Sequence, residues 1–298
     1  MYLHPRESDF SISHNRHSFF CLHETVLEQG SGRENEDTLS VENDIYVVCD
    51  GATTIGDGPN GCSISGGRQA AALTAEVLSH NHGDLQDLVQ QANTEIFQAM
   101  TESSVDLDDR ESLWSTSFAA LRFDGDCIEW AQSGDCMIVL IHQDGSTELV
   151  TEQPGHDIAT LQKWKARGPR EKGSIHQVLA REIAEVRRGM NRNYGVLNGE
   201  QAALDFVNYG VKNVSTVTDI LLFSDGLWLP DELPEKPLDI STFVQLYKNV
   251  GLNGIKNHIR RIQREDPRCY RYPRFKMYDD ISGIALKRVS FSYSGSIP

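Results

Sequence analysis

Two short apolar stretches of this sequence each end in an aspartate followed by a glycine. The first runs from Ile45 to Gly51 and delivers Asp50, and the second runs from Ile220 to Gly226 and delivers Asp225. Both stretches are rich in residues that favour buried β-strands, so each is predicted to carry a carboxylate at a strand tip. A single Asp-Gly after a strand is more often a turn than a ligand. Two in one chain favour a shared site.

Three further aspartates occupy comparable positions. Asp37 precedes a predicted strand, Asp279 begins the last one, and Asp135 follows Gly134 at a tight turn. Carboxylates gathered at one sheet edge repel each other unless cations compensate, and Mg²⁺ and Mn²⁺ prefer oxygen ligands. The backbone beside Gly51 can approach closely, so its carbonyl is another candidate ligand. Because paired divalent ions activate water and neutralise phosphate charge, the pattern predicts a metal-dependent phosphatase.

Composition excludes several other classes of protein. The chain has 298 residues and a formal net charge of −15, which argues against binding to nucleic acid or to an anionic membrane. No apolar run approaches the roughly 20 residues that span a bilayer, and the first residues lack an apolar signal core. The six cysteines are scattered and contain no C-x-x-C pair, which is typical of reduced core thiols. We therefore expect a soluble, cytoplasmic, monomeric protein.

The order of the predicted elements indicates an α+β fold. Strands come first, followed by two helices (68–79 and 84–103), a β-meander (115–150), a helical region with a short helix at 201–208, a strand, a helix interrupted near Gly251 (239–264) and a last strand (279–286). Strands and helices that are segregated in this way favour antiparallel sheets over βαβ units. We predict one domain at 17–288, a flexible N-terminal segment at 1–16 and a flexible tail at 289–298.

The acidic segments, taken in order, resemble the motifs of the metal-dependent serine/threonine protein phosphatases of the 2C type, especially bacterial members. The resemblance covers about 18–288 and rests on Asn35-Glu36-Asp37, Val47-Val48-Cys49-Asp50-Gly51, Ser115-Thr116-Ser117 with Ser133-Gly134-Asp135, Leu221-Leu222-Phe223-Ser224-Asp225-Gly226-Leu227, and Asp279-Asp280-Ile281-Ser282. It implies a four-layer α-β-β-α sandwich of two mainly antiparallel sheets flanked by helices.

The resemblance also implies a ligand set for two ions, Mn²⁺ or Mg²⁺, and a more weakly held third. By position, Asp50 would bridge two ions and the Gly51 carbonyl would bind one of them. The remaining implied ligands are Asp225 and Asp279 for the other ion, Glu36 and Asp37 directly or through water, and Asp135 with Asp225 for the third ion. In the terminal pair, the first aspartate aligns with the ligand, so Asp279 is preferred to Asp280.

The chain departs from the family pattern beside these motifs. Ala52 stands where some relatives carry a histidine as a proposed general acid, and Gly66-Gly67 follows Gly51 only after an inserted loop. Arg33 is the candidate phosphate clamp, although it lies four rather than five residues before Asp37.

A local basic cluster in this acidic chain comprises Arg187, Arg188 and Arg192. It has two interpretations of equal weight: a solvated helix end that complements the helix dipole, or a surface that recruits substrate phosphate.

The expected activity is hydrolysis of a phosphomonoester by metal-activated water, with phosphoserine or phosphothreonine in a protein as substrate. Asp50, Asp225 and Arg33 are its predicted catalytic residues. One alternative is a degenerate phosphatase-like module that binds phosphoproteins without turnover, which the altered loop 52–65 motivates. A phosphatase for small metabolites or nucleotides is also open, because specificity depends on the loops around 51–67 and 154–200.

Overall fold

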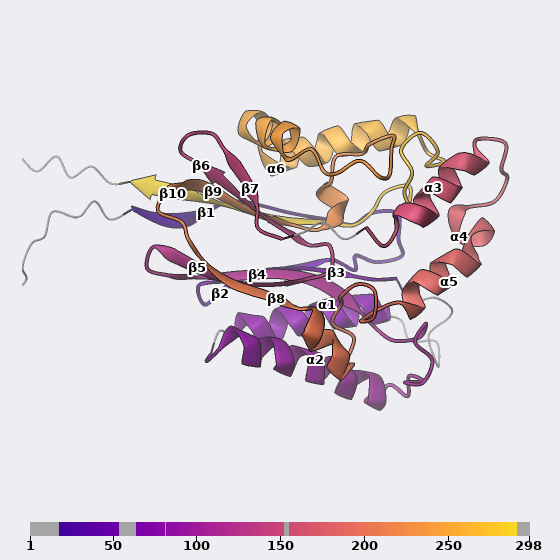
Figure 1. Ribbon diagram of the computed structural model, residues 1–298, viewed down its shortest axis with the longest axis horizontal. Coiled ribbons are helices and arrows are strands. Elements are labelled where there is room, and N and C mark those ends of the chain that lie inside the picture. The colour runs from indigo at the N-terminus through magenta and orange to yellow at the C-terminus, as the bar shows by residue number, and fades with distance from the viewer. Residues whose placement is uncertain (1–17, 54–63, 81, 152–154, 291–298) are drawn as a thin grey trace, which may run out of the picture.

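Two five-stranded sheets lie face to face in the computed structural model, which describes residues 18–53, 64–80, 82–151 and 155–290 (Figure 1). Every pair of neighbouring strands is antiparallel. One sheet has the order β1 (Ser18–Glu28), β10 (Ile281–Ser290), β9 (Val217–Phe223), β6 (Met137–His142) and β7 (Thr147–Leu149). The other has the order β2 (Thr38–Glu42), β3 (Ile45–Gly51), β4 (Thr116–Asp124), β5 (Cys127–Ser133) and β8 (Asn208–Asn213).

Helices cover both outer faces and one end of this sandwich (Figure 1). The second sheet is covered by α1 (Gly66–Ser79) and α2 (Leu85–Glu102), and the first by α6 (Ile240–Glu265). At one end lie α3 (Ile158–Arg167), α4 (Ile175–Val178) and α5 (Ala180–Arg188). Two short 3₁₀ helices, η2 (Gln201–Phe206) and η3 (Asp225–Leu227), complete the elements of the described ranges. The predicted α+β class and the four-layer arrangement are confirmed.

Strand β3 is buried on both of its faces. Val47 and Cys49 belong to the core between the second sheet and helices α1 and α2, whereas Val48 belongs to the core between the two sheets. This double burial is the reason for the unbroken apolar run in the sequence. Because side chains alternate along a strand, Asp50 shares the face of Val48, and its carboxylate is directed between the sheets at their edge.

The strand register brings four distant segments to one end of the sandwich. Thr38 pairs with Cys49, so the start of β2 lies beside the end of β3. Gly283 pairs with Phe223, so the start of β10 lies beside the end of β9. In Figure 1 this is the end at which α3, α4 and α5 lie. The predicted meeting of strand tips is therefore a property of the fold.

Helix α6 is interrupted at the predicted glycine. Gly251 has φ of 69°, a conformation that favours glycine, and it divides the helix into two segments. The carboxylate of Glu24 on β1 accepts hydrogen bonds from the backbone N–H groups of Leu252 (2.7 Å) and Asn253 (3.0 Å). These bonds satisfy donors at the start of the second segment and attach α6 to β1.

The structure differs from the sequence-based prediction at β8. The predicted helix 201–208 ends as η2 at Phe206, and residues 208–213 form an edge strand. Its sequence, Asn-Tyr-Gly-Val-Lys-Asn, lacks an apolar alternation because an edge strand with one solvated side does not require one. Tertiary pairing with β5 decides its conformation.

The chain ends fall largely outside the described residues. The predicted N-terminal segment 1–16 lies outside them, as do residues 291–298 of the predicted tail. Strand β10 includes Val289 and Ser290, the first two residues of that tail, paired with β1. No helix in the described ranges is both long enough and apolar enough to cross a membrane.

Candidate active site

A cleft of about 410 Å³ opens at the end of the sandwich where the strand tips meet. Its lining includes five of the predicted ligands: Asp50, Gly51, Asp135, Asp225 and Asp279. Helices α4 and α5 form the opposite wall, through His176, Ile183 and Arg187 among others. The fold therefore brings together acidic residues that are almost 230 positions apart in sequence.

Asp50 and Asp225 form the acidic centre of this cleft. Their carboxyl groups lie within hydrogen-bonding reach of each other. Burial, followed by the charges of Asp37 and Asp225, raises the pKa of Asp50 well above its ordinary value. Burial, followed by the charges of Asp279 and Asp135, does the same to the pKa of Asp225. Two carboxyl groups in contact in a largely desolvated site require a shared proton or a cation, which is the behaviour expected of metal ligands.

Asp37 is buried and is not among the residues that line the cleft. Its Oδ2 accepts hydrogen bonds from the hydroxyls of Ser224 (2.6 Å) and Ser282 (2.8 Å). Burial raises the pKa of Asp37 to about 7, although the two serine hydrogen bonds act in the opposite direction. Two serines, one from each of the motifs that contain Asp225 and Asp279, thus hold the carboxylate of Asp37.

Asp279 and Asp280 have separate roles in this structure. Asp280 is buried and accepts hydrogen bonds from the backbone N–H groups of Gly30 (2.6 Å) and Glu36 (2.8 Å). The side chain of Asp279 instead faces the cleft, while its backbone carbonyl accepts a hydrogen bond from Arg260 on α6 at 2.7 Å. Asp280 therefore attaches the loop before β2, and Asp279 is the one available as a ligand.

Glu36 is buried, and hydroxyl groups surround its carboxylate. Thr53 donates a hydrogen bond to Oε2, and Ser65 donates one to Oε1 at 2.6 Å. The ammonium group of Lys276 lies 3.5 Å from Glu36 Oε2 and 3.0 Å from Asp279 Oδ1. Burial acts to lower the pKa of Lys276, but the charges of Asp279, Glu36 and Asp50 outweigh it, and the pKa is raised.

Close backbone contacts hold the two Asp-Gly turns in place. A Cβ atom on Gly51 would lie 2.3 Å from the carbonyl oxygen of Gly67, and one on Gly226 would lie 1.8 Å from that of Asp280. Gly67 therefore lies against the Asp50-Gly51 turn, although the inserted loop separates the two in sequence. Thr116 Oγ1 also donates a hydrogen bond to the backbone oxygen of Asp50 at 2.9 Å. Neither glycine can be replaced without displacing a neighbouring backbone segment.

The donor set fits hydrated, oxygen-ligated divalent ions. Within the described ranges, no three histidine, cysteine, aspartate or glutamate side chains converge closely enough to enclose an ion by themselves. Mg²⁺ does not require such an enclosure, because it commonly uses one or two carboxylates and keeps several waters. The contacting carboxyls of Asp50 and Asp225, next to the tightly packed backbone of Gly51, match this type of coordination.

The two candidate phosphate-binding arginines lie in different environments. Arg33 is exposed, does not line the cleft, and makes no hydrogen bond or ion pair with another described residue. Arg187, which the sequence presented only as part of a basic cluster, is 9% exposed and lines the cleft. The sequence signal for Arg187 was its place at the end of an amphipathic helix, which did not distinguish it from Arg188.

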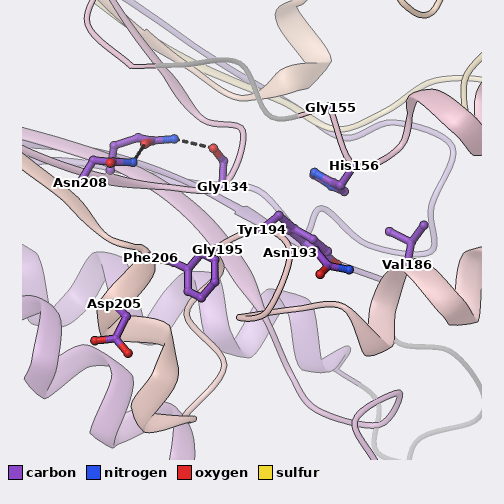
Figure 2. Close-up of a pocket in the computed structure, with 11 residues that line it drawn as sticks. Gly134, Gly155, His156, Val186, Asn193, Tyr194, Gly195, Asp205, Phe206 and Asn208 are labelled. Atoms are coloured by element: carbon purple, nitrogen blue, oxygen red, sulfur yellow. Dashed lines mark hydrogen bonds between the residues drawn. The ribbon is translucent and has the colours of Figure 1, made fainter.

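A second pocket, of about 580 Å³, adjoins the cleft (Figure 2). His156 and Tyr194 line both cavities, and their rings are stacked with centroids 3.9 Å apart. His156 Nε2 lies 3.4 Å from Asp157 Oδ2. Sequence reasoning did not select His156 or Lys276 as site residues, because neither lies in a recognisable motif.

Solved structures of known proteins share this arrangement of sheets and helices. The catalytic domain of the serine/threonine protein phosphatase PstP, in complex with two manganese ions, aligns with a TM-score of 0.55 and 16% identity, over 91% of this chain and 98% of that one. This protein has the fold of serine/threonine protein phosphatases. The PPM phosphatase MsPP from Mycobacterium smegmatis aligns with a TM-score of 0.51 and 17% identity, over 89% of this chain and 97% of that one.

The serine/threonine phosphatase Stp1 from Staphylococcus aureus has the same fold, with a TM-score of 0.50 and 15% identity, over 95% of this chain and 98% of that one. No family model matches the sequence, and no curated protein matches it. The likeness is thus carried by the arrangement of the strands and helices, while the sequence has diverged.

Proposed function

We propose that this protein is a metal-dependent protein serine/threonine phosphatase. The observation that carries the proposal is the contact between the carboxyls of Asp50 and Asp225, at two strand tips, with Asp135 and Asp279 beside them in one cleft. Bound divalent ions would activate a water molecule and neutralise the charge of a phosphate group. The phosphatase fold provides independent support for this reading of the cleft.

The proposed ligands are those that the resemblance implies, and the presence of Asp50, Gly51, Asp135, Asp225 and Asp279 in one cleft supports them. Asp50 and the Gly51 carbonyl would hold one ion, and Asp50 with Asp225 and Asp279 would hold a second. Glu36 and Asp37 would bind directly or through water. Hydroxyl donors already occupy both oxygens of Glu36 and Oδ2 of Asp37, which favours the route through water for Glu36. Asp135 would hold a weaker third ion with Asp225. The two manganese ions in the PstP complex support Mn²⁺ or Mg²⁺ as the cofactor.

The proposed substrate is a phosphoserine or phosphothreonine side chain of a protein, and the proposed state is a monomer. A cytoplasmic location is supported by the cysteines of the described residues, all of which are free, with Cys49, Cys136 and Cys269 buried. The degenerate alternative receives no support, because each implied ligand position still carries a side chain or carbonyl that can bind an ion.

Metal-dependent turnover tests this proposal directly. The purified protein should release phosphate from an aryl phosphate and from phosphoserine peptides when Mn²⁺ is added, and it should be inactive in EDTA. Asp50→Asn should lose at least about 100-fold in kcat/KM, because a bridging ligand is removed. If the wild-type protein and Asp50→Asn are equally inactive with Mn²⁺ and with Mg²⁺, the proposed phosphatase activity is refuted. Phosphopeptide binding without turnover would instead support the binding module.

A further inference from the structure

Arg187 is a buried cation in the wall of the cleft. It occupies the last turn of α5 and is 9% exposed. The other two arginines of the basic cluster, Arg188 and Arg192, are exposed. Helix α5 therefore ends with one arginine directed into the cleft and one directed to solvent.

Two backbone carbonyls hold the guanidinium of Arg187. Its Nη1 donates a hydrogen bond to the oxygen of Thr53 at 2.6 Å, and its Nη2 donates one to the oxygen of Leu113 at 3.4 Å. Its Nε is buried and has no hydrogen-bond partner in the part of the chain that the structure describes. Guanidinium has five N–H donors in one plane, so two carbonyls orient the group and leave Nε and further donors for a ligand.

Arg187 also lacks an ionic partner among the described residues. The neighbouring Arg188 forms an ion pair with Glu111 at 2.6 Å, and Arg110 pairs with Glu200. Burial, which is its largest influence, lowers the pKa of Arg187. The charges of Glu36 and Glu111 act in the opposite direction, but neither carboxylate forms an ion pair with Arg187. A buried cation that makes no direct ion pair is suited to take an anion as its partner.

The loop that follows Asp50 connects Arg187 to the carboxylate side of the cleft. Thr53 donates its hydroxyl hydrogen bond to Glu36 and accepts the hydrogen bond of Arg187 at its carbonyl. Thr53 alone therefore links the guanidinium of Arg187 to the carboxylate of Glu36, through its carbonyl and its hydroxyl group. An anion that bridges the two sides of the cleft would contact the acidic, metal-binding side and Arg187 together.

We propose that Arg187 binds the phosphoryl group of the substrate, in the role that the sequence suggested for Arg33. The inference rests on the proposed function, because a phosphate ester is the anion such an enzyme binds. The unpaired Nε–H and a terminal N–H form a fork that matches two phosphate oxygens. A phosphate dianion would also give Arg187 a directly paired counter-charge, which none of the described carboxylates provides. Arg33 is exposed and does not line the cleft, so the phosphate-binding arginine of this chain comes from α5.

Binding of inorganic phosphate tests this role without requiring turnover. Calorimetry on Mg²⁺-loaded protein would compare wild type with Arg187→Gln and Arg187→Lys, and with Arg188→Gln as the matched control from the same helix end. Loss of a charge-assisted hydrogen bond predicts phosphate binding about tenfold or more weaker in Arg187→Gln. Arg187→Lys should recover part of the affinity because it restores the charge without the fork. Arg188→Gln should bind phosphate as wild type does.

Two further measurements exclude a merely structural effect. Arg187→Gln should retain the Mn²⁺ affinity of wild type. Phosphate binding is measured below the unfolding temperature of each variant, because both replacements lose hydrogen bonds to the carbonyls of Thr53 and Leu113 and should lower that temperature. If Arg33→Gln rather than Arg187→Gln abolishes phosphate binding, or if wild type binds no phosphate, the assignment of Arg187 is wrong. If wild type binds phosphate through Arg187 but hydrolyses no phosphoester, the assignment stands and the proposed function fails.

Discussion

The ammonium group of Lys276 lies 3.0 Å from Asp279 Oδ1 and 3.5 Å from Glu36 Oε2. Both carboxylates belong to the proposed metal-binding set, and Lys276 itself lines the cleft. The lysine therefore neutralises charge on this side of the site in the metal-free protein. A divalent ion that binds to Asp279 must displace this ammonium group or share the carboxylate with it.

Removing the lysine is expected to tighten metal binding. Lys276→Met should bind Mn²⁺ about tenfold more tightly, because the ion no longer competes with an internal cation for Asp279. The same variant should be less stable without metal, since Glu36 and Asp279 lose their counter-charge. Titration calorimetry with Mn²⁺ and thermal unfolding in EDTA measure the two effects.

Lys256→Met is a matched control for this prediction. Lys256 is similarly buried and pairs with Glu28 at 2.7 Å, but it does not line the cleft. Its replacement should leave the Mn²⁺ affinity unchanged. A lower Mn²⁺ affinity in Lys276→Met than in wild type would show that the lysine assists the ion instead of opposing it.

Replacement by asparagine should affect mainly the stability at Asp280 and mainly the metal affinity at Asp279. Asp280→Asn places an amide where the backbone N–H groups of Gly30 and Glu36, the second of them buried, both require acceptors, so we expect it to lower the free energy of unfolding by about 2–4 kcal/mol. Asp279→Asn removes a partly exposed ion pair, for which a loss of no more than about 1 kcal/mol is expected. Asp279→Asn should nevertheless weaken Mn²⁺ binding at least tenfold.

Denaturant unfolding in EDTA and Mn²⁺ titration together distinguish the two variants. The opposite result, in which Asp280→Asn loses the metal at unchanged metal-free stability, would exchange the assigned roles of Asp279 and Asp280.

The stability of the metal-free protein should decrease as the pH rises towards neutrality. Burial raises the pKa of Asp37 to about 7 from the ordinary value of 3.8. The folded state therefore retains a proton that the unfolded state has lost, and the stabilising contribution present below about pH 4 is lost progressively up to about pH 7. One such group contributes a slope of about −1.4 kcal/mol per pH unit within this window.

Asp37→Asn isolates this contribution. The variant keeps an oxygen acceptor for Ser224 and Ser282 but carries no ionisable group, so its stability in EDTA should depend less on pH than that of wild type. Urea unfolding between pH 5 and pH 7 provides the comparison. Identical pH dependence in the two proteins would show that Asp37 titrates at its ordinary value when folded.

Local patterns were sufficient to predict the parts of this fold that are buried in a regular way. The apolar runs that end at Asp50 and Asp225 identified strands β3 and β9, because a strand buried on both faces must be apolar throughout. The glycine at 251 identified the break in α6 for an equally local reason, its positive φ. Strand β8 could not be predicted in this way, because its polar sequence becomes a strand only through pairing with β5.

The carboxylates and Asp-Gly turns of this protein can be read from its amino-acid sequence, and their order indicated the phosphatase-like set. How neighbouring residues of the same type divide their roles depends on tertiary packing. Asp279 faces the cleft while Asp280 accepts backbone N–H groups, and Arg187 lines the cleft while Arg188 pairs with Glu111. Adjacent residues have nearly the same sequence context, but they are directed to different surroundings, and burial and hydrogen-bond partners there decide what each side chain can do.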